Sequence, residues 1–167
     1  MKRLVSLLLT LSATLTIAFA QGKPASPLAT VEATIGAAKV KIVYSQPSAR
    51  GRQVVGNLVP YDKVWRTGAN EATTIQFDKP VKIEGKDVPA GRYSLFTIPM
   101  EKQWTIIINK TADQMGAFDY KKEDDVLRVT VPSKKAPAFV ETFNIAIVND
   151  NVELKWENTL VAFKIKG

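Results

Sequence analysis

The sequence predicts an all-β protein: an antiparallel β-sandwich of roughly eight to ten short strands with at most one short helical turn. Three observations favour this fold class. Apolar and polar residues alternate with a period of two in many short segments, turn-forming residues separate those segments, and helical periodicity is almost absent. A closed β-barrel is the alternative, because the same pattern of short strands also closes into barrels.

The first predicted strands each have one apolar and one polar face. The residues expected on the buried faces are Val40, Ile42 and Tyr44, then Ile75 and Phe77, then Val81 and Ile83. Pro47 ends the first of these segments, and Gly85-Lys86 forms a turn after the third. Alternation of this kind indicates strands that cover a core on one side and face solvent on the other.

Two segments in the middle of the chain are apolar on both faces. They read RYSLFTIP over residues 92–99 and WTIIIN over residues 104–109. Strands that are apolar on both faces are typical of positions covered from both sides. We therefore expect these two strands to form the centre of the fold.

The C-terminal third predicts one more strand and then two consecutive hairpins. Leu127, Val129 and Val131 form the strand, which Pro132 is expected to end. The residues expected on the buried faces of the hairpins are Phe139, Phe143, Ile145 and Ile147, then Val152, Leu154 and Trp156, then Val161, Phe163 and Ile165. The single candidate for a helical turn is Thr111–Ala117, where Thr111 could cap the first turn and Gly116 could end it.

The N-terminus has the features of a secretory signal peptide. Lys2 and Arg3 precede an uncharged apolar run over residues 4–18, and Ala18-Phe19-Ala20 supplies the small residues that a signal peptidase requires. A transmembrane helix is less favoured, since a spanning segment needs roughly 20 mainly apolar residues, and five Ser and Thr residues interrupt this shorter run. The sequence therefore predicts cleavage near Ala20 and export to the periplasm or the extracellular space.

The predicted organisation is a signal peptide over residues 1–20, a polar lead over 21–29 and a single β-sandwich domain over 30–167. The formal charge of +7 falls by two to +5 when Lys2 and Arg3 are removed. That excess favours anionic partners such as an acidic glycan or a lipid head group. Nucleic acid is not expected, because the cations are scattered along strands without interleaved aromatic residues.

The chain contains no histidine and no cysteine. Their absence excludes Ser-His-Asp and Cys-His nucleophiles, zinc sites built from imidazole or thiolate, and disulfides. No cofactor or metal site is expected, and binding is favoured over catalysis. The one weak catalytic candidate is the carboxylate of Glu71, for which the sequence shows no partner carboxylate of the kind a glycosidase needs.

The segment Pro47–Thr73 has little strand alternation and is long for a connection within a domain. Its apolar residues predict that it is packed and ordered rather than disordered. The candidate ligand-binding residues in it are Arg50, Arg52, Tyr61, Trp65, Arg66, Asn70 and Glu71. Guanidinium groups could bind an anion here. Alternatively, Trp65 and Tyr61 anchor the loop while the arginines satisfy loop carbonyls, and Glu71 pairs with Arg66.

Several stretches of the chain closely resemble a family of exported bacterial proteins, known as domain of unknown function 2911. They include VKIVYSQPSARGR, LVPYDKVWRTGANEATTIQF, VPAGRYSLFTIP, WTIIINK and WENTLVAFKI. The resemblance covers residues 26–165. It implies no catalytic residues, because the family has no assigned activity.

Taken together, the residues predict an exported, non-enzymatic module that binds a polar or anionic envelope component, namely a glycan, a lipid head group or an envelope protein. The segment Arg50–Glu71 is the expected binding region. Two alternatives remain open at this stage. One is a glycan hydrolase that uses Glu71, and the other is a structural or adaptor domain.

Overall fold

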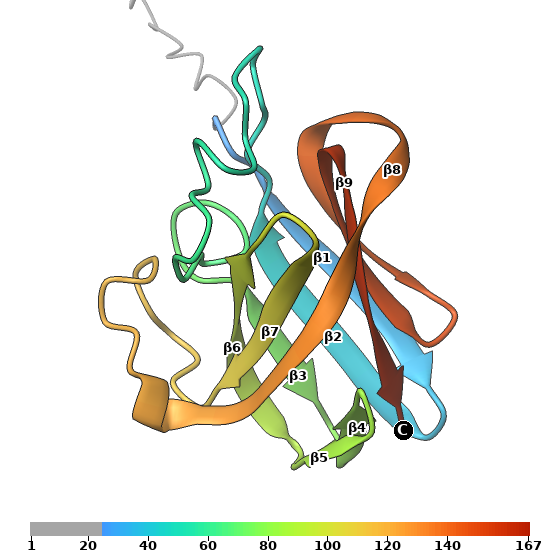
Figure 1. Ribbon diagram of the computed structural model, residues 1–167. Helices are drawn as coiled ribbons and strands as arrows, with labels where there is room; N and C mark the ends of the chain where they lie inside the picture. The colour runs from blue at the N-terminus through green and yellow to red at the C-terminus, as the bar shows by residue number, and fades with distance from the viewer. Residues whose placement is uncertain (1–24) are drawn as a thin grey trace, which may run out of the picture.

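The computed structural model describes residues 25–167, and within this range the protein is all-β apart from one 3-10 turn (Figure 1). The strands are β1 (Leu28–Ile35), β2 (Ala38–Ser45), β3 (Thr74–Phe77), β4 (Val81–Ile83), β5 (Lys86–Val88), β6 (Gly91–Pro99), β7 (Gln103–Asn109), β8 (Asp125–Val148) and β9 (Asn151–Lys166). The turn η1 spans Lys122–Asp124.

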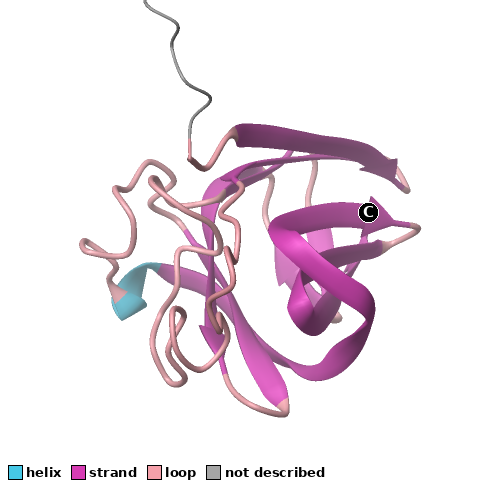
Figure 2. Ribbon diagram, turned by 90° about the horizontal axis from the view of Figure 1, so that it is seen from above, coloured by secondary structure: helices cyan, strands magenta, loops and turns pink. Residues whose placement is uncertain are grey.

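All nine strands belong to one antiparallel sheet with the order β1-β2-β3-β6-β7-β8-β9-β4-β5. The sheet curls so that β1, β2, β3, β6 and β7 form one layer and the β8–β9 hairpin packs against it (Figure 2). The sheet does not close on itself. The predicted antiparallel sandwich of roughly eight to ten strands is therefore confirmed in preference to the barrel.

The core lies between the two layers and contains the residues predicted from alternation. Val40, Ile42 and Tyr44 of β2 are buried, as are Ile75 and Phe77 of β3. They meet Phe143 and Ile145 of β8 and the apolar face of β9. Burial of each such side chain contributes about 1.5–3 kcal/mol to folding, so this interior supplies most of the stability.

The central strands β6 and β7 are covered on both faces, as the sequence predicts. Leu95 and Ile106 face the main core, whereas Phe96 and Ile107 belong to a second buried cluster on the opposite face. The second cluster is completed by Ala72, with Val64, Ile98, Ala117 and Tyr120 packed against it. The loops over residues 47–73 and 110–121 therefore cover the outer face of this part of the sheet.

Of the two predicted C-terminal hairpins, the first is present and the second is not. One turn, at Asn149-Asp150, joins β8 to β9, and β9 then runs without interruption from Asn151 to Lys166. Glu157 adopts a left-handed conformation with φ 49°, and the pairing register shifts between Lys135 and Val140. Such bulges bend both strands together. The hairpin folds back on itself, so that the Ile165 N–H donates to the Asp150 carbonyl at 2.7 Å.

Two further predictions for β8 need correction. Pro132 does not end its strand, because β8 leaves β7 at the Gln103–Pro132 pair and continues with β9 as its partner. A proline is tolerated where a ladder hydrogen bond is no longer required. Phe139 is 57% exposed rather than buried, because it lies in the stretch between the two registers, where the alternation of faces is lost.

The predicted helical turn at Thr111–Ala117 is also wrong, since the 3-10 turn lies at Lys122–Asp124. The Thr111 carbonyl, which a helix would use, instead accepts hydrogen bonds from the side chains of Ser94 at 2.8 Å and Gln114 at 2.6 Å. These side chains hold the loop in a non-helical path along β6. Competition of this kind between side chains and backbone is common in loops.

The predicted signal peptide over residues 1–20 lies outside the described residues. Within residues 25–167, no helix has the length and apolar character required to cross a membrane.

Tyr44 links the two layers, and its removal gives a direct test of how they are joined. Its hydroxyl accepts a hydrogen bond from the Ile145 N–H at 2.9 Å and donates to the Ile145 carbonyl at 3.3 Å. Tyr44→Phe leaves both buried backbone groups unpaired, so the free energy of unfolding should fall by about 1–3 kcal/mol in urea denaturation. Tyr61→Phe is the control, because Tyr61 is 40% exposed. Equal stability of the two variants would contradict this role.

Candidate functional site

A hollow of about 280 Å³ lies between the loop 47–73 and the bend of the β8–β9 hairpin. In Figure 1 this loop rises above the sheet beside the bent top of β8 and β9. The residues lining the hollow are Pro47, Arg52, Leu58, Val59, Trp65, Arg66, Gly68, Ala69, Asn70 and Trp156. We call it the Arg–Trp pocket. It contains four of the seven candidate binding residues: Arg52, Trp65, Arg66 and Asn70.

Two tryptophans line the apolar side of the pocket. Trp65 and Trp156 lie nearly parallel, with ring centroids 5.7 Å apart and an interplanar angle of 21°. Trp65 is fixed by two backbone hydrogen bonds with Thr97 of β6, at 2.8 and 3.0 Å, and its indole N–H donates to the Gly68 carbonyl at 3.1 Å. The indole N–H of Trp156 donates to the Glu141 carbonyl at 3.1 Å. Both rings are therefore held in defined positions.

The two arginines of the pocket are oriented by backbone carbonyls. Arg52 donates through Nε to Ala49 O and through Nη2 to Ser48 O, both at 2.9 Å. Arg66 donates through Nη1 to Asn70 O at 2.7 Å. These contacts are those of the alternative in which the arginines satisfy loop carbonyls. A guanidinium has five N–H donors, however, and these bonds use only some of them.

The lining of the Arg–Trp pocket includes two guanidinium groups and no carboxylate. Like charges that share a concave, partly apolar site raise the local potential and favour a negatively charged occupant. Phe118 extends this surface, because the Arg66 guanidinium carbon lies 5.8 Å from the centre of its ring. The arrangement is suited to holding an anionic group against apolar walls.

The backbone of the WRTGANEAT stretch is strained at the pocket. Thr67 is fully buried and has φ 55°, a conformation that a β-branched residue rarely adopts, and Asn70 has φ 59°. Thr67 is held by the Thr73 hydroxyl, which donates to its carbonyl at 2.7 Å, and by a 3.1 Å contact with the Thr97 hydroxyl. Strained residues of this type cluster at ligand clamps and active sites.

Gly68 serves close packing in this stretch. A Cβ atom at this position would lie 3.0 Å from the Ser45 carbonyl oxygen and 3.0 Å from the Thr73 hydroxyl oxygen. The turn of the chain is made by its neighbours Thr67 and Asn70, which have positive φ. Gly68 therefore allows the loop to approach β2.

The other three candidate residues lie outside the Arg–Trp pocket. Arg50 donates through its backbone N–H to the Glu141 carboxylate at 2.7 Å and through Nη2 to Ala25 O at 3.1 Å. The ring of Tyr61 lies against Gly56, where a Cβ would come within 2.7 Å of it. Glu71 makes no ion pair with Arg66 among the described residues, and it lines a different hollow.

The hollow beside Glu71 is small, about 60 Å³, and it also contains the ion pair between Arg92 and Asp113, whose charged atoms are 2.7 Å apart. It lies at the rim of β2, β3 and β6, next to Gln114, whose buried side-chain oxygen has no hydrogen-bond partner within residues 25–167. Asp113 is a second carboxylate that the sequence did not connect to Glu71. The available space corresponds to about two water molecules.

Sequence reasoning missed Trp156 as a site residue. Its alternation with Val152 and Leu154 places it in a strand core, and it is indeed only 4% exposed. The bend of β9 beside Glu157 brings its edge to the pocket. The Glu157 carboxylate accepts hydrogen bonds from the N–H groups of Val54 and Val55, at 3.0 and 3.3 Å, and so ties the bend to the loop.

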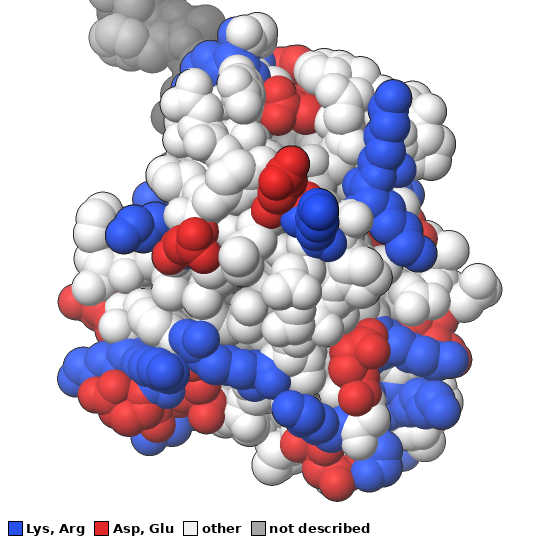
Figure 3. All heavy atoms as spheres, viewed as in Figure 1, with Lys and Arg blue, Asp and Glu red and all other residues white. Residues whose placement is uncertain are grey.

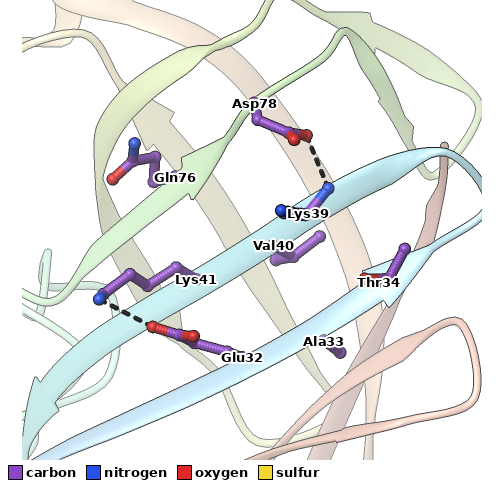
Figure 4. Close-up of a pocket in the computed structure, with 8 residues that line it drawn as sticks. All are labelled: Glu32, Ala33, Thr34, Lys39, Val40, Lys41, Gln76 and Asp78. Atoms are coloured by element: carbon purple, nitrogen blue, oxygen red, sulfur yellow. Dashed lines mark hydrogen bonds and ion pairs between the residues drawn. The ribbon is translucent and has the colours of Figure 1, made fainter.

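Another hollow, of about 490 Å³, lies on the outer face of β1, β2 and β3 (Figure 4). Three of its charged side chains make contacts within it: Lys41 pairs with Glu32 at 2.7 Å, and the Asp78 carboxylate accepts a hydrogen bond from the backbone N–H of Lys39 at 2.6 Å. Its lining contains no aromatic residue and carries both signs of charge. We interpret it as a solvated sheet face.

The positive charge of the chain does not form one broad patch on the face shown in Figure 3. There, Lys and Arg side chains lie mostly beside Asp and Glu side chains, in mixed groups around the lower part of the view. Attraction of an anion would therefore depend on local groups such as those of the Arg–Trp pocket rather than on a large field over this face.

The fold and the site define an all-β protein with a curled antiparallel sheet and an arginine- and tryptophan-lined pocket beside its long loop. The family model described as "Protein of unknown function (DUF2911)" matches residues 26–165, and the chain belongs to this family. The resemblance noted from the sequence is thereby confirmed. Comparisons with curated proteins and with solved structures found no match.

The loop over residues 110–121, which carries Phe118 to the pocket, is anchored by a hydrogen-bonded cluster. The Tyr120 hydroxyl donates to the Asp125 carboxylate at 2.6 Å and accepts from Arg128, which also binds Asp125 at 2.5 Å. Asn109 donates to the other carboxylate oxygen at 2.9 Å. Burial, reinforced by the hydrogen bond to Asp125, raises the pKa of Tyr120 above 10.0, although Arg128 opposes this shift.

The raised pKa of Tyr120 predicts an alkaline loss of stability. The unfolded chain releases the Tyr120 proton near pH 10.0, whereas the folded chain keeps it to higher pH, so the unfolding free energy should fall as pH rises above 10. Urea denaturation at increasing pH should show this fall, and Tyr120→Phe should reduce its slope. Tyr93→Phe is a matched comparison, because burial also raises the pKa of Tyr93. An unchanged slope in Tyr120→Phe would contradict the assignment.

Proposed function

We propose that this protein is an exported, non-enzymatic binding module whose Arg–Trp pocket holds an anionic group of an envelope component. Export to the periplasm or the extracellular space rests on the sequence of residues 1–20. The observation that carries the binding proposal is the presence of two oriented guanidinium groups, and no carboxylate, in a pocket lined by two stacked tryptophans.

The chemistry of the pocket favours a carboxylate or phosphate group attached to a partly apolar body. Guanidinium groups bind such anions bidentately. Hydrogen bonds to backbone carbonyls already orient the guanidinium groups of Arg52 and Arg66. Leu58, Val59 and Trp65 supply apolar contact. An acidic glycan or a phosphorylated lipid head group fits this description, as does an acidic segment of an envelope protein.

Hydrolysis at Glu71 is less favoured by the geometry. Glu71 and Asp113 line the same hollow, but Asp113 is paired with Arg92. The hollow of about 60 Å³ has room for about two water molecules, and a sugar ring is considerably larger. Binding in the larger Arg–Trp pocket is therefore the better-supported function.

The pocket arginines can be tested by calorimetry against acidic sugars, inorganic phosphate and phosphorylated lipid head groups. Arg52→Ala and Arg66→Ala should each weaken binding of an anionic ligand by about 10- to 100-fold, since charge-assisted hydrogen bonds contribute about 1.5–3 kcal/mol. Arg50→Ala is the matched control, because it removes an equal charge from the same loop outside the pocket.

If Arg50→Ala weakens binding as much as the other two variants, the effect reflects net charge and the pocket is not the site. If no ligand of the panel binds the unmodified protein, the proposal loses its support.

Glu71→Gln separates binding from hydrolysis. It should leave both the affinity for the anionic ligand and the melting temperature nearly unchanged, because Glu71 lies outside the Arg–Trp pocket and is exposed. Calorimetry and thermal unfolding measure these quantities, and release of reducing ends from acidic glycans measures turnover. Turnover by the unmodified protein that disappears in Glu71→Gln would instead establish the hydrolase.

A further inference from the structure

A second hollow, of about 190 Å³, adjoins the Arg–Trp pocket. The two share the side chains of Leu58, Val59, Trp65 and Arg66. The second hollow adds Pro60, Lys63, Val64 and Ala117, and we call it the Lys63 hollow. Because Trp65 and Arg66 line both spaces, the two hollows lie next to each other with this pair between them, and we call the two hollows together the groove.

The cations of this groove are spread along it. Arg52 lines only the Arg–Trp pocket, Lys63 lines only the Lys63 hollow, and Arg66 lines both. Neither lining includes an Asp or Glu residue. Lys63 is exposed and forms no ion pair within residues 25–167. A single small anion would use only part of this arrangement.

We propose that the groove binds a linear acidic oligosaccharide, with one uronic-acid-type unit in the Arg–Trp pocket and the next in the Lys63 hollow. This inference rests on the proposed function and specifies its ligand. The carboxylate of the first unit meets Arg52 and Arg66, and that of the second meets Arg66 and Lys63. Trp65 offers apolar contact in both positions, as sites with a few convergent polar groups on apolar walls commonly do.

The surroundings of the groove favour a glycan over an anionic membrane surface. Leu58, which is 44% exposed, lines both hollows of the groove. Outside the lining, Tyr61 of the same loop and Phe118 beside Arg66 are 40% and 81% exposed. Each is followed in the chain by an exposed carboxylate, Asp62 and Asp119, and these would be repelled by anionic head groups. The unpaired cations instead lie within the hollows, where a chain of sugars can reach them.

The length of the oligosaccharide gives the decisive test. Galacturonic acid, its dimer and its trimer are titrated into the mature protein by calorimetry at low salt, with the corresponding neutral galactose oligomers as controls. The dimer should bind at least about tenfold more tightly than the monomer, and the trimer no more than a few-fold better than the dimer. The neutral oligomers should bind far more weakly.

Two variants test which hollow binds which sugar unit. Lys63→Gln should reduce dimer affinity to nearly that of the monomer while leaving monomer affinity unchanged, and Arg52→Ala should weaken both.

Equal affinity for monomer and dimer, with dependence on Arg52 and Arg66 retained, would overturn the two-unit groove and leave the proposed function standing. If no acidic sugar binds but vesicles of anionic lipid do, and Phe118→Ser abolishes that binding, the glycan inference is wrong. If neither probe binds, the glycan inference is wrong, and the titrations with inorganic phosphate and phosphorylated head groups described above decide the proposed function.

Discussion

The candidate site depends on the packing of the Trp65 indole against the core. The indole comes from a loop, yet it lies among Trp104 of β7, Phe143 of β8 and Trp156 of β9, with ring centroids 6.1, 5.0 and 5.7 Å away. One side chain therefore joins both layers of the sheet. Aromatic contacts of this kind contribute about 0.5–1.5 kcal/mol each beyond their burial, so the loop is attached firmly to the core. Arg66, the next residue in the chain, is consequently placed at the surface in a defined position.

The strands could be predicted from the sequence because their signal is local. Burial of Val40, Ile42 and Tyr44 follows from a period of two that any reader of the chain can see. The bend of the β8–β9 hairpin is different. It depends on a bulge after Lys135 and on Glu157, whose carboxylate binds backbone N–H groups of Val54 and Val55 about one hundred positions earlier in the chain. No window of sequence around residue 157 contains that contact, so the sequence predicts a second hairpin where the structure has a bend.

The candidate site shows the same division. The absence of histidine and cysteine excludes the common nucleophiles, and the residue types in the loop 47–73 predict either an anion site or an anchored loop whose arginines satisfy carbonyls. Their grouping could not be predicted. Arg66 and Glu71 are five positions apart but line different hollows, because the left-handed residues Thr67 and Asn70 turn the chain between them. Trp156 joins Arg66 only through the bend of a strand that is distant in sequence.

The strain at Thr67 and the orientation of Arg66 are consistent with a site prepared in advance. The left-handed conformation of Thr67 costs about 1–3 kcal/mol, and hydrogen bonds from Thr73 and a contact with Thr97 maintain it. It sets the turn that brings the Asn70 carbonyl to Arg66 at 2.7 Å. A guanidinium held in this way loses less side-chain entropy when a ligand binds than a free one would, and the affinity gained by such preorganisation offsets part of the cost of association. Strained residues cluster at ligand clamps and active sites, and in this loop the strained residue directly follows Arg66.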